Sequence, residues 1–453
     1  MLRNKLLWVI VISVVVRLIF ATVYHYNGYP DTYDYFQVAK EIHNKFSDDK
    51  MEVGNILWPR PPLFPLLINL AGFQAKRIVF YQAVMGVGIA VFLYLIFSRL
   101  TGSSMAGMLA GFCYALNPSQ MLFEFALISE TTGTFLFIGA VFLFFIVLTE
   151  NSKPKISILI ALGFLVSLST ACRSQFKIII ALMAVFLAWR LYRQARPELL
   201  KIIAYIAPIA LIFALLSSNA VSLDGTQPVV GLSMMENLIV YAEQAPDEFK
   251  DYREIIIKNR EEYLAVDGSA VVHSIALAIP ELREKAGGDF TVLSNDCIRM
   301  AFAIIRKIPI EYSKIVISNI VDFWKPTWYS RQFGLRAVLA GERKLSKTVA
   351  VCHAIVHLAF MLVFLAIPVL YILCPGFRKN APVRLEILFI YAAVFSANIL
   401  DSIFSFGEPR HKTSFEPLIF GAVIWLAFAQ YRRWKTIESK EGAGKSAEGE
   451  LDE

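Results

Sequence analysis

The sequence predicts an all-α polytopic membrane protein with about ten transmembrane helices. Of its 453 residues, 57% are hydrophobic and only 18% are charged, whereas soluble domains average about 25% charged residues. The mean hydropathy is +0.55. Apolar runs of about 20 residues, the length that a helix needs to cross a bilayer, recur along the chain. These observations exclude a soluble enzyme, a disordered chain and a secreted disulfide scaffold.

Ten apolar runs delimit the predicted spans, and their charged flanks orient them. With the N-terminus placed in the cytoplasm, the basic connections fall on the inner side, as the positive-inside rule demands. The first run follows Arg3 and Lys5 as in a signal peptide, but it lacks a small-residue cleavage site, so we interpret it as an uncleaved span. This orientation explains the excess of Lys and Arg behind the net charge of +7, so membrane lipids are expected partners and nucleic acid is not. The predicted spans are 7–24, 78–98, 104–117, 131–149, 156–172, 177–193, 202–218, 348–374, 384–402 and 415–431.

The spans divide the chain into four parts. A transmembrane part, 1–218, includes a long first outer loop with an amphipathic stretch that must end before Pro59–Pro62. An extracytoplasmic helical domain, 219–347, contains amphipathic pieces such as Phe249 to Val266. A second transmembrane part, 348–431, precedes a cytoplasmic tail, 432–453, whose Gly, Lys and Glu content predicts disorder.

The ionisable side chains that a membrane protein should avoid gather at the outer ends of the predicted spans. Such groups are costly at membrane depth unless they are paired or functional. Lone carboxylates such as Asp34 and Glu124 are often solvated, and Arg17, in the middle of the first span, is expected to pair with a buried carboxylate or to snorkel. The residues in this group are Asp31, Asp34, Arg60, Glu124, Glu130, Arg173, Asp401, Arg410, His411 and Lys412.

The sequence indicates neither a metal centre nor a disulfide framework. The five cysteines are scattered and include no CxxC pair. His353 and His357 have the spacing of a two-histidine metal pair on one helix face, but no Glu follows the first and no third ligand is evident. No cofactor is therefore predicted, although nothing in the sequence forbids a divalent metal.

Five short motifs, in chain order, resemble those of the GT-C superfamily of integral-membrane glycosyltransferases. Asp31, Tyr35 and Ala39 fit the pattern Asp, three residues, Tyr, three residues, Ala that follows the first span in this superfamily. The resemblance is greatest to dolichyl-phosphate-mannose-protein mannosyltransferases and aminoarabinose transferases. The chain departs from the pattern at Thr32, where the mannosyltransferases usually have Glu, and at His411, where an aromatic residue is usual. The other motifs are Arg60-Pro61-Pro62-Leu63-Phe64-Pro65, Leu127-Ile128-Ser129-Glu130, Ala171-Cys172-Arg173, and Pro409-Arg410-His411-Lys412 through Glu416-Pro417.

The resemblance implies transfer of a sugar from a polyprenyl-phosphate donor at the outer leaflet, with inversion, catalysed by an acidic residue of the first outer loop. Such a reaction needs a base for the attacking hydroxyl or amine and cations for the departing phosphate. Asp31 is the predicted base, with burial raising its basicity. Glu130 either orients the acceptor or sugar hydroxyls or pairs with an arginine. The predicted substrate-binding residues, with the phosphate assigned to Arg410, Lys412 and Arg60 or Arg173, are Tyr35, Arg60, Glu130, Arg173, Arg410, His411 and Lys412.

The predicted location is the plasma (inner) membrane, with the site on the extracytoplasmic side and a role in cell-envelope glycosylation. The acceptor, whether lipid, glycan or protein, stays open. The main alternative is a transporter or flippase of a lipid-linked or anionic substrate. That class places essential charges near the midplane and has matching halves, whereas here only Arg17 lies mid-span and no repeat is found. A further alternative is a receptor or assembly subunit that binds proteins through 219–347.

Overall fold

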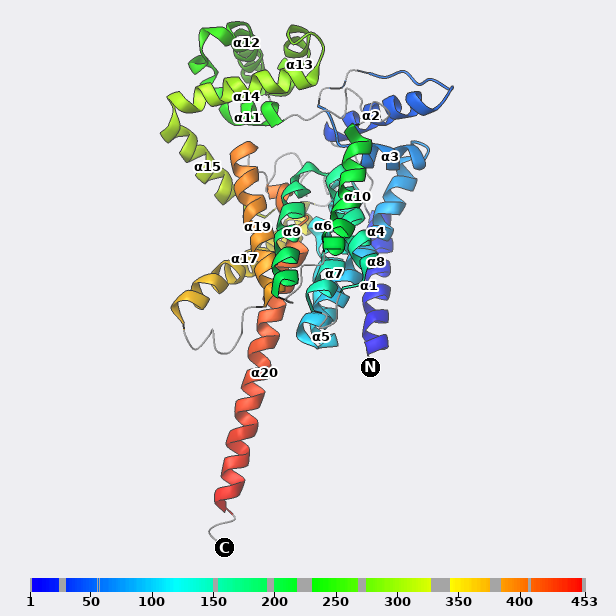
Figure 1. Ribbon diagram of the computed structural model, residues 1–453, viewed down its shortest axis with the longest axis vertical. Helices are drawn as coiled ribbons and strands as arrows, with labels where there is room; N and C mark the ends of the chain where they lie inside the picture. Colours follow the sequence, from blue (N-terminus) through cyan, green and yellow to red (C-terminus); the bar gives the residue numbers. More distant parts are fainter. Residues whose placement is uncertain are drawn as a thin grey trace.

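The computed structural model describes residues 2–23, 30–54, 56, 58–149, 154–193, 199–217, 230–267, 274–326, 343–374, 384–405 and 409–449. Within these ranges every regular element is a helix (Figure 1). Six helices are long and apolar enough to cross a membrane alone, and α5, α8 and α10 are shorter apolar helices. The predicted all-α polytopic class is therefore confirmed.

Each of the ten predicted spans coincides with one helix of the bundle. The bundle contains a continuous apolar core to which all of these helices contribute. The helices are α1 (Leu2–Val23), α4 (Ala75–Thr101), α5 (Ser104–Ala115), α7 (Glu130–Thr149), α8 (Ile156–Cys172), α9 (Lys177–Arg193), α10 (Leu199–Ser217), α17 (Arg343–Leu373), α19 (Leu385–Phe404) and α20 (Glu416–Gly449).

Small residues bring neighbouring helices of the bundle together. A Cβ atom at Gly107 of α5 would clash with the carbonyl oxygen of Tyr94 on α4, and one at Gly163 of α8 would clash with that of Tyr205 on α10. Between α4 and α5 the chain reverses at Gly102, whose φ of +63° is a left-handed conformation that glycine adopts without strain. Close approach of backbones is a common way of packing helices in lipid, where the hydrophobic effect does not drive helices together.

Two helices precede the second span. The predicted amphipathic stretch forms α2 (Pro30–Phe46), which buries Val38 and Ile42, and the proline-rich segment ends where α3 (Leu63–Leu70) begins. A third short helix, α6 (Pro118–Glu124), is followed by a buried non-helical bend, 125–129. Side chains satisfy two of this bend's carbonyls: Gln82 Nε2 donates to Ile128 O at 2.7 Å, and Thr32 Oγ1 donates to Leu127 O at 3.1 Å.

A separate group of helices sits at one end of the bundle, and we call it the helical cap (Figure 1). It comprises α11 (Val230–Leu238), α12 (Lys250–Asp267), α13 (Ser274–Lys285) and α14 (Phe290–Lys307), packed around a hydrophobic core of its own. The predicted amphipathic piece at 249–266 corresponds to α12. From α14, α15 (Pro309–Phe323) runs diagonally toward the bundle and packs against α19.

The last helix differs from the sequence expectation. The sequence predicts disorder from residue 432, but α20 continues as a helix to Gly449 and projects from the bundle (Figure 1). Once a helix has nucleated on its apolar part, each further residue adds a hydrogen bond at little cost. Lys and Glu, each of which occurs three times between 435 and 449, also favour the helix.

Candidate functional site

Three segments that are distant in sequence meet at the carboxylate of Asp31. Asp31 lies in the first turn of α2, Arg60 lies in the proline-rich segment before α3, and Arg410 lies on the short 3₁₀ helix η7 (Pro409–Lys412). Arg60 Nη2 donates to Asp31 Oδ1 at 2.7 Å, and Arg410 Nη1 donates to Asp31 Oδ2 at 2.7 Å. The carboxylate is thus held between two guanidinium groups.

The electrostatics of Asp31 differ from the sequence expectation. Burial alone would raise the pKa of Asp31, but the positive charges of Arg410 and Arg60 outweigh it and hold that pKa well below its usual range. The expectation that burial makes Asp31 a stronger base is therefore wrong for this arrangement. While both ion pairs persist, Asp31 is ionised at neutral pH and only weakly basic.

The side chain of Arg60 is itself fixed by its neighbours on α2. Asp34 Oδ2 lies 3.2 Å from Arg60 Nη2, and Asp34 is buried, so of the two readings of this carboxylate the structure shows the paired one. The guanidinium also stacks over the Tyr35 ring, 5.2 Å from its centroid. Tyr35 is hydrogen-bonded through its hydroxyl to Ser129 Oγ at 2.6 Å, and burial raises the pKa of this phenol to about 12. The neutral phenol of Tyr35 therefore helps to position the Arg60 guanidinium.

A second ion pair joins two more predicted residues. Arg173, just after α8, approaches Glu130, the first residue of α7, with Nη1 and Oε1 separated by 2.6 Å. Gly133 makes room for this pair, since a Cβ atom there would lie 2.9 Å from Arg173 Cδ. Of the two readings of Glu130, the structure shows the pairing with an arginine. Gly133 is a site residue that sequence reasoning missed, and its only signal was a glycine one turn after Glu130.

The other two predicted site residues of the last motif, His411 and Lys412, do not reach Asp31. His411 Nδ1 lies 2.7 Å from Asp401 Oδ1 at the end of α19. Lys412 is fully buried, donates to Lys325 O at 2.5 Å and lies 3.0 Å from His357 Nε2. The predicted phosphate contact of Lys412 therefore conflicts with its position.

Lys412 belongs to a buried polar group that we call the Lys412 cluster, with His357 and Glu416. Its Nζ is 3.7 Å from Glu416 Oε1, and His357 Nδ1 is 3.5 Å from the same oxygen. Burial lowers the pKa of Lys412 to about 8, although the Glu416 carboxylate opposes this shift. The neighbouring His353 donates a hydrogen bond through Nε2 to Asn117 Oδ1, 3.0 Å away. No group of three metal-ligating side chains occurs within the described residues.

Arg17 and Glu124 form a further buried pair inside the bundle. Arg17 Nη2 donates to Glu124 Oε1 at 2.5 Å, and Tyr114 donates to the same oxygen at 2.9 Å. The expected pairing of Arg17 with a buried carboxylate is confirmed, and the solvated reading of Glu124 is wrong. A Cβ atom at Gly86 would collide with the Glu124 carboxylate, so Gly86 and Tyr114 are further contributors that the sequence alone did not reveal.

Part of the chain matches a family of the class that the sequence motifs resemble. Residues 60–221 match the family described as Dolichyl-phosphate-mannose-protein mannosyltransferase. This stretch includes Arg60, Glu130 and Arg173 but neither Asp31 nor Arg410. No curated protein sequence matches the chain.

Two solved structures match the chain. The archaeal oligosaccharyltransferase AglB from Archaeoglobus fulgidus, in complex with an inhibitory peptide and a dolichol-phosphate, matches with a TM-score of 0.50 and 16% identity over 97% of this chain and 52% of that one. The chain therefore spans about half the length of AglB. ArnT from Cupriavidus metallidurans, bound to undecaprenyl phosphate, has a TM-score of 0.36 and 11% identity over 94% and 77% of the two chains. The predicted resemblance to GT-C glycosyltransferases is confirmed by the family match and by the AglB-like fold.

Proposed function

We propose that this protein is a glycosyltransferase that moves a sugar from a polyprenyl-phosphate donor to an acceptor at the extracytoplasmic face of the plasma membrane. The observation that carries the proposal is the carboxylate of Asp31 held between Arg60 and Arg410. The family match and the GT-C fold support the same class of reaction.

The two arginines suit the donor phosphate. A guanidinium can engage phosphate oxygens with two parallel hydrogen bonds, and Arg60 and Arg410 keep 13% and 12% of their side-chain surface accessible. A phosphate that enters this site competes with Asp31 for Arg410. As Arg410 turns toward the phosphate, Asp31 loses a cation that lowers its pKa, so its basicity rises when the donor binds.

The reaction then needs one proton transfer and one displacement. Asp31 accepts the proton of the acceptor hydroxyl or amine as the oxygen or nitrogen of that group bonds to the anomeric carbon. The bond between the anomeric carbon and the phosphate oxygen breaks, and the phosphate leaves with the electron pair toward the arginines. Attack from the side opposite the phosphate inverts the anomeric centre.

Replacing Asp31 by Asn tests the base. The change keeps the size of the side chain but removes the charge and one of the two oxygens that accept from the arginines, so we expect transfer to fall by about 100-fold or more while expression persists. Asp34→Asn, on the same helix, is the matched control and should lose much less. Lipid, glycan and protein glycosylation is compared in cells that lack the protein and are complemented with each variant. If Asp31→Asn retains activity within a few-fold of wild type, Glu130 becomes the next candidate.

Cys297 tests the side of the membrane. It lies buried in α14 of the helical cap, so it should react with an impermeant thiol reagent in spheroplasts once a denaturant has opened the outer face. A variant without the other four cysteines gives an unambiguous signal. Labelling that requires lysis of the membrane would place the cap in the cytoplasm and overturn the proposed orientation.

A further inference from the structure

Helix α15 is hydrogen-bonded to the end of α19, the helix that leads to the Arg410 turn. Tyr312 donates to Ile403 O at 2.6 Å. Asn319, which is buried, donates through Nδ2 to Ser402 O and Ser405 O, each at 3.2 Å. The last carbonyls of a helix lack hydrogen-bond partners within the helix. Side chains of α15 supply donors to several of these carbonyls at the end of α19.

The C-terminal end of α15 is tied to the other side of the same turn. Lys412 Nζ donates to Lys325 O at 2.5 Å. Trp324, beside it, packs against Phe364 of α17 and Phe395 of α19, with ring centroids 6.2 and 5.7 Å apart. The contacts of α15 therefore bracket Arg410, with Ser405 on one side and Lys412 on the other.

The helical cap joins this junction through a second amide. Asn237, at the end of α11, donates to Ser405 O at 2.5 Å and accepts from Asn319 Nδ2 at 3.1 Å. Both asparagines are buried, with 6% and 8% of their surface exposed. Buried amides keep one geometry when all their partners are satisfied, so this pair fixes the angle between the cap, α15 and α19.

We propose that Asn319 is a positioning residue that holds Arg410 in place for the donor phosphate and makes the helical cap and the η7 turn one mechanical unit. The inference rests on the proposed function, since it assigns the phosphate to Arg410. Asn319 acts through the backbone of 402–405 and touches no substrate itself. Loss of its donor leaves the end of α19 free to shift, and Arg410 shifts with it.

Asn319→Asp tests this inference, because it replaces a donor by a carboxylate that faces three oxygen acceptors. The probe is undecaprenyl phosphate, titrated into the full-length protein in nanodiscs. We expect its Kd to rise about tenfold, because a shift of Arg410 weakens the charge-assisted hydrogen bond of its guanidinium to the phosphate. Binding of undecaprenol, which lacks the phosphate, should not change. Ser318→Asp makes a comparable change on the exposed side of α15 and should leave both affinities unaltered.

A double-mutant cycle separates positioning from general destabilisation. In an Arg410→Ala background Asn319→Asp should have no further effect on the Kd of undecaprenyl phosphate, because the group that it positions is gone. The same tenfold loss in both backgrounds would overturn the inference. If Asn319→Asp does not fold, Asn237→Ala takes its place in the cycle with a smaller expected shift. If Arg410→Ala alone leaves the Kd unchanged, the proposed phosphate site fails.

Discussion

The Asp31 site and the Lys412 cluster lie on the two sides of one short turn, yet their charged groups differ in accessibility. At the site, Asp31 and Arg410 keep 18% and 12% of their side-chain surface exposed, whereas Lys412 and Glu416 keep none. A charged residue in a partly accessible ion pair can exchange its partner for a ligand. In a fully buried pair, neither residue can leave the other without exposing an uncompensated charge to a low dielectric. Accessibility therefore separates exchangeable pairs from structural ones on this turn.

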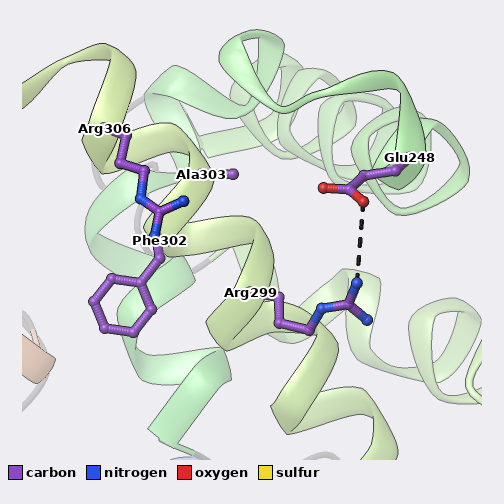
Figure 2. Close-up of a pocket in the computed structure, with 5 residues that line it drawn as sticks. All are labelled: Glu248, Arg299, Phe302, Ala303 and Arg306. Carbon is purple, nitrogen blue, oxygen red and sulfur yellow. Dashed lines mark ion pairs between the residues drawn. The ribbon is translucent and has the colours of Figure 1, made fainter.

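The cap surface extends the comparison to a mostly exposed ion pair. Arg299, Phe302 and Arg306 of α14 line a cavity of about 300 Å³, where Arg299 lies 4.0 Å from Glu248 (Figure 2). Arg299 is 66% exposed. Such pairs contribute only about 0–1 kcal/mol, because water and salt screen them. We therefore expect a ligand to replace one residue of an ion pair where that pair is neither largely exposed to solvent nor fully buried, as at Asp31.

The largest expected effect is on the buried pair of Arg17 and Glu124. Arg17→Met leaves Glu124 buried without its cation and should lower the free energy of unfolding by about 3–5 kcal/mol. The double variant with Glu124→Leu removes both charges and should recover most of that loss. Thermal unfolding of the detergent-solubilised protein measures both changes. A single variant as stable as wild type would show that full burial does not make a pair structural here.

The Lys412 cluster predicts a pH dependence of stability. The pKa of Lys412 falls from 10.5 to about 8 on folding, so between these values the unfolded chain binds more protons than the folded one. Stability therefore rises with pH through this window, by an amount on the order of 3 kcal/mol. Unfolding midpoints of wild type and Lys412→Met from pH 7 to 10 should diverge in favour of wild type. Parallel curves would contradict a buried, weakly basic Lys412.

The accessible pair should show a graded effect on donor binding and little effect on stability. Arg410→Lys keeps the charge but loses the planar fork, and Arg410→Ala loses both, so the affinity for donor should fall in the order wild type, Lys, Ala. Loss of a charge-assisted hydrogen bond costs about 1.5–3 kcal/mol, or about 10- to 150-fold in the Ala variant. Turnover against donor concentration in nanodiscs measures this order. Unchanged donor dependence in Arg410→Ala would return the pair to a purely structural role.

Much of the fold was predictable from residue patterns because lipid imposes one local requirement. A segment that crosses the bilayer must satisfy its backbone within a helix and must be apolar over about 20 residues. Those signals lie within one continuous stretch, and all ten predicted spans coincide with helices. The tail beyond residue 431 was not predictable in this way, because its composition allows both a disordered segment and an extension of α20.

The sequence by itself determined which ionisable residues stand near the ends of the spans. Only the tertiary structure decided which partner each of them has. Arg410 and Lys412 are two residues apart in one motif, but on a 3₁₀ turn their side chains leave in different directions. One meets Asp31, 379 positions away, and the other meets His357, 55 positions away. Such pairings depend on how distant helices pack, and no local pattern records this, so a cation suited to a phosphate and a cation sealed in the interior look alike in the sequence.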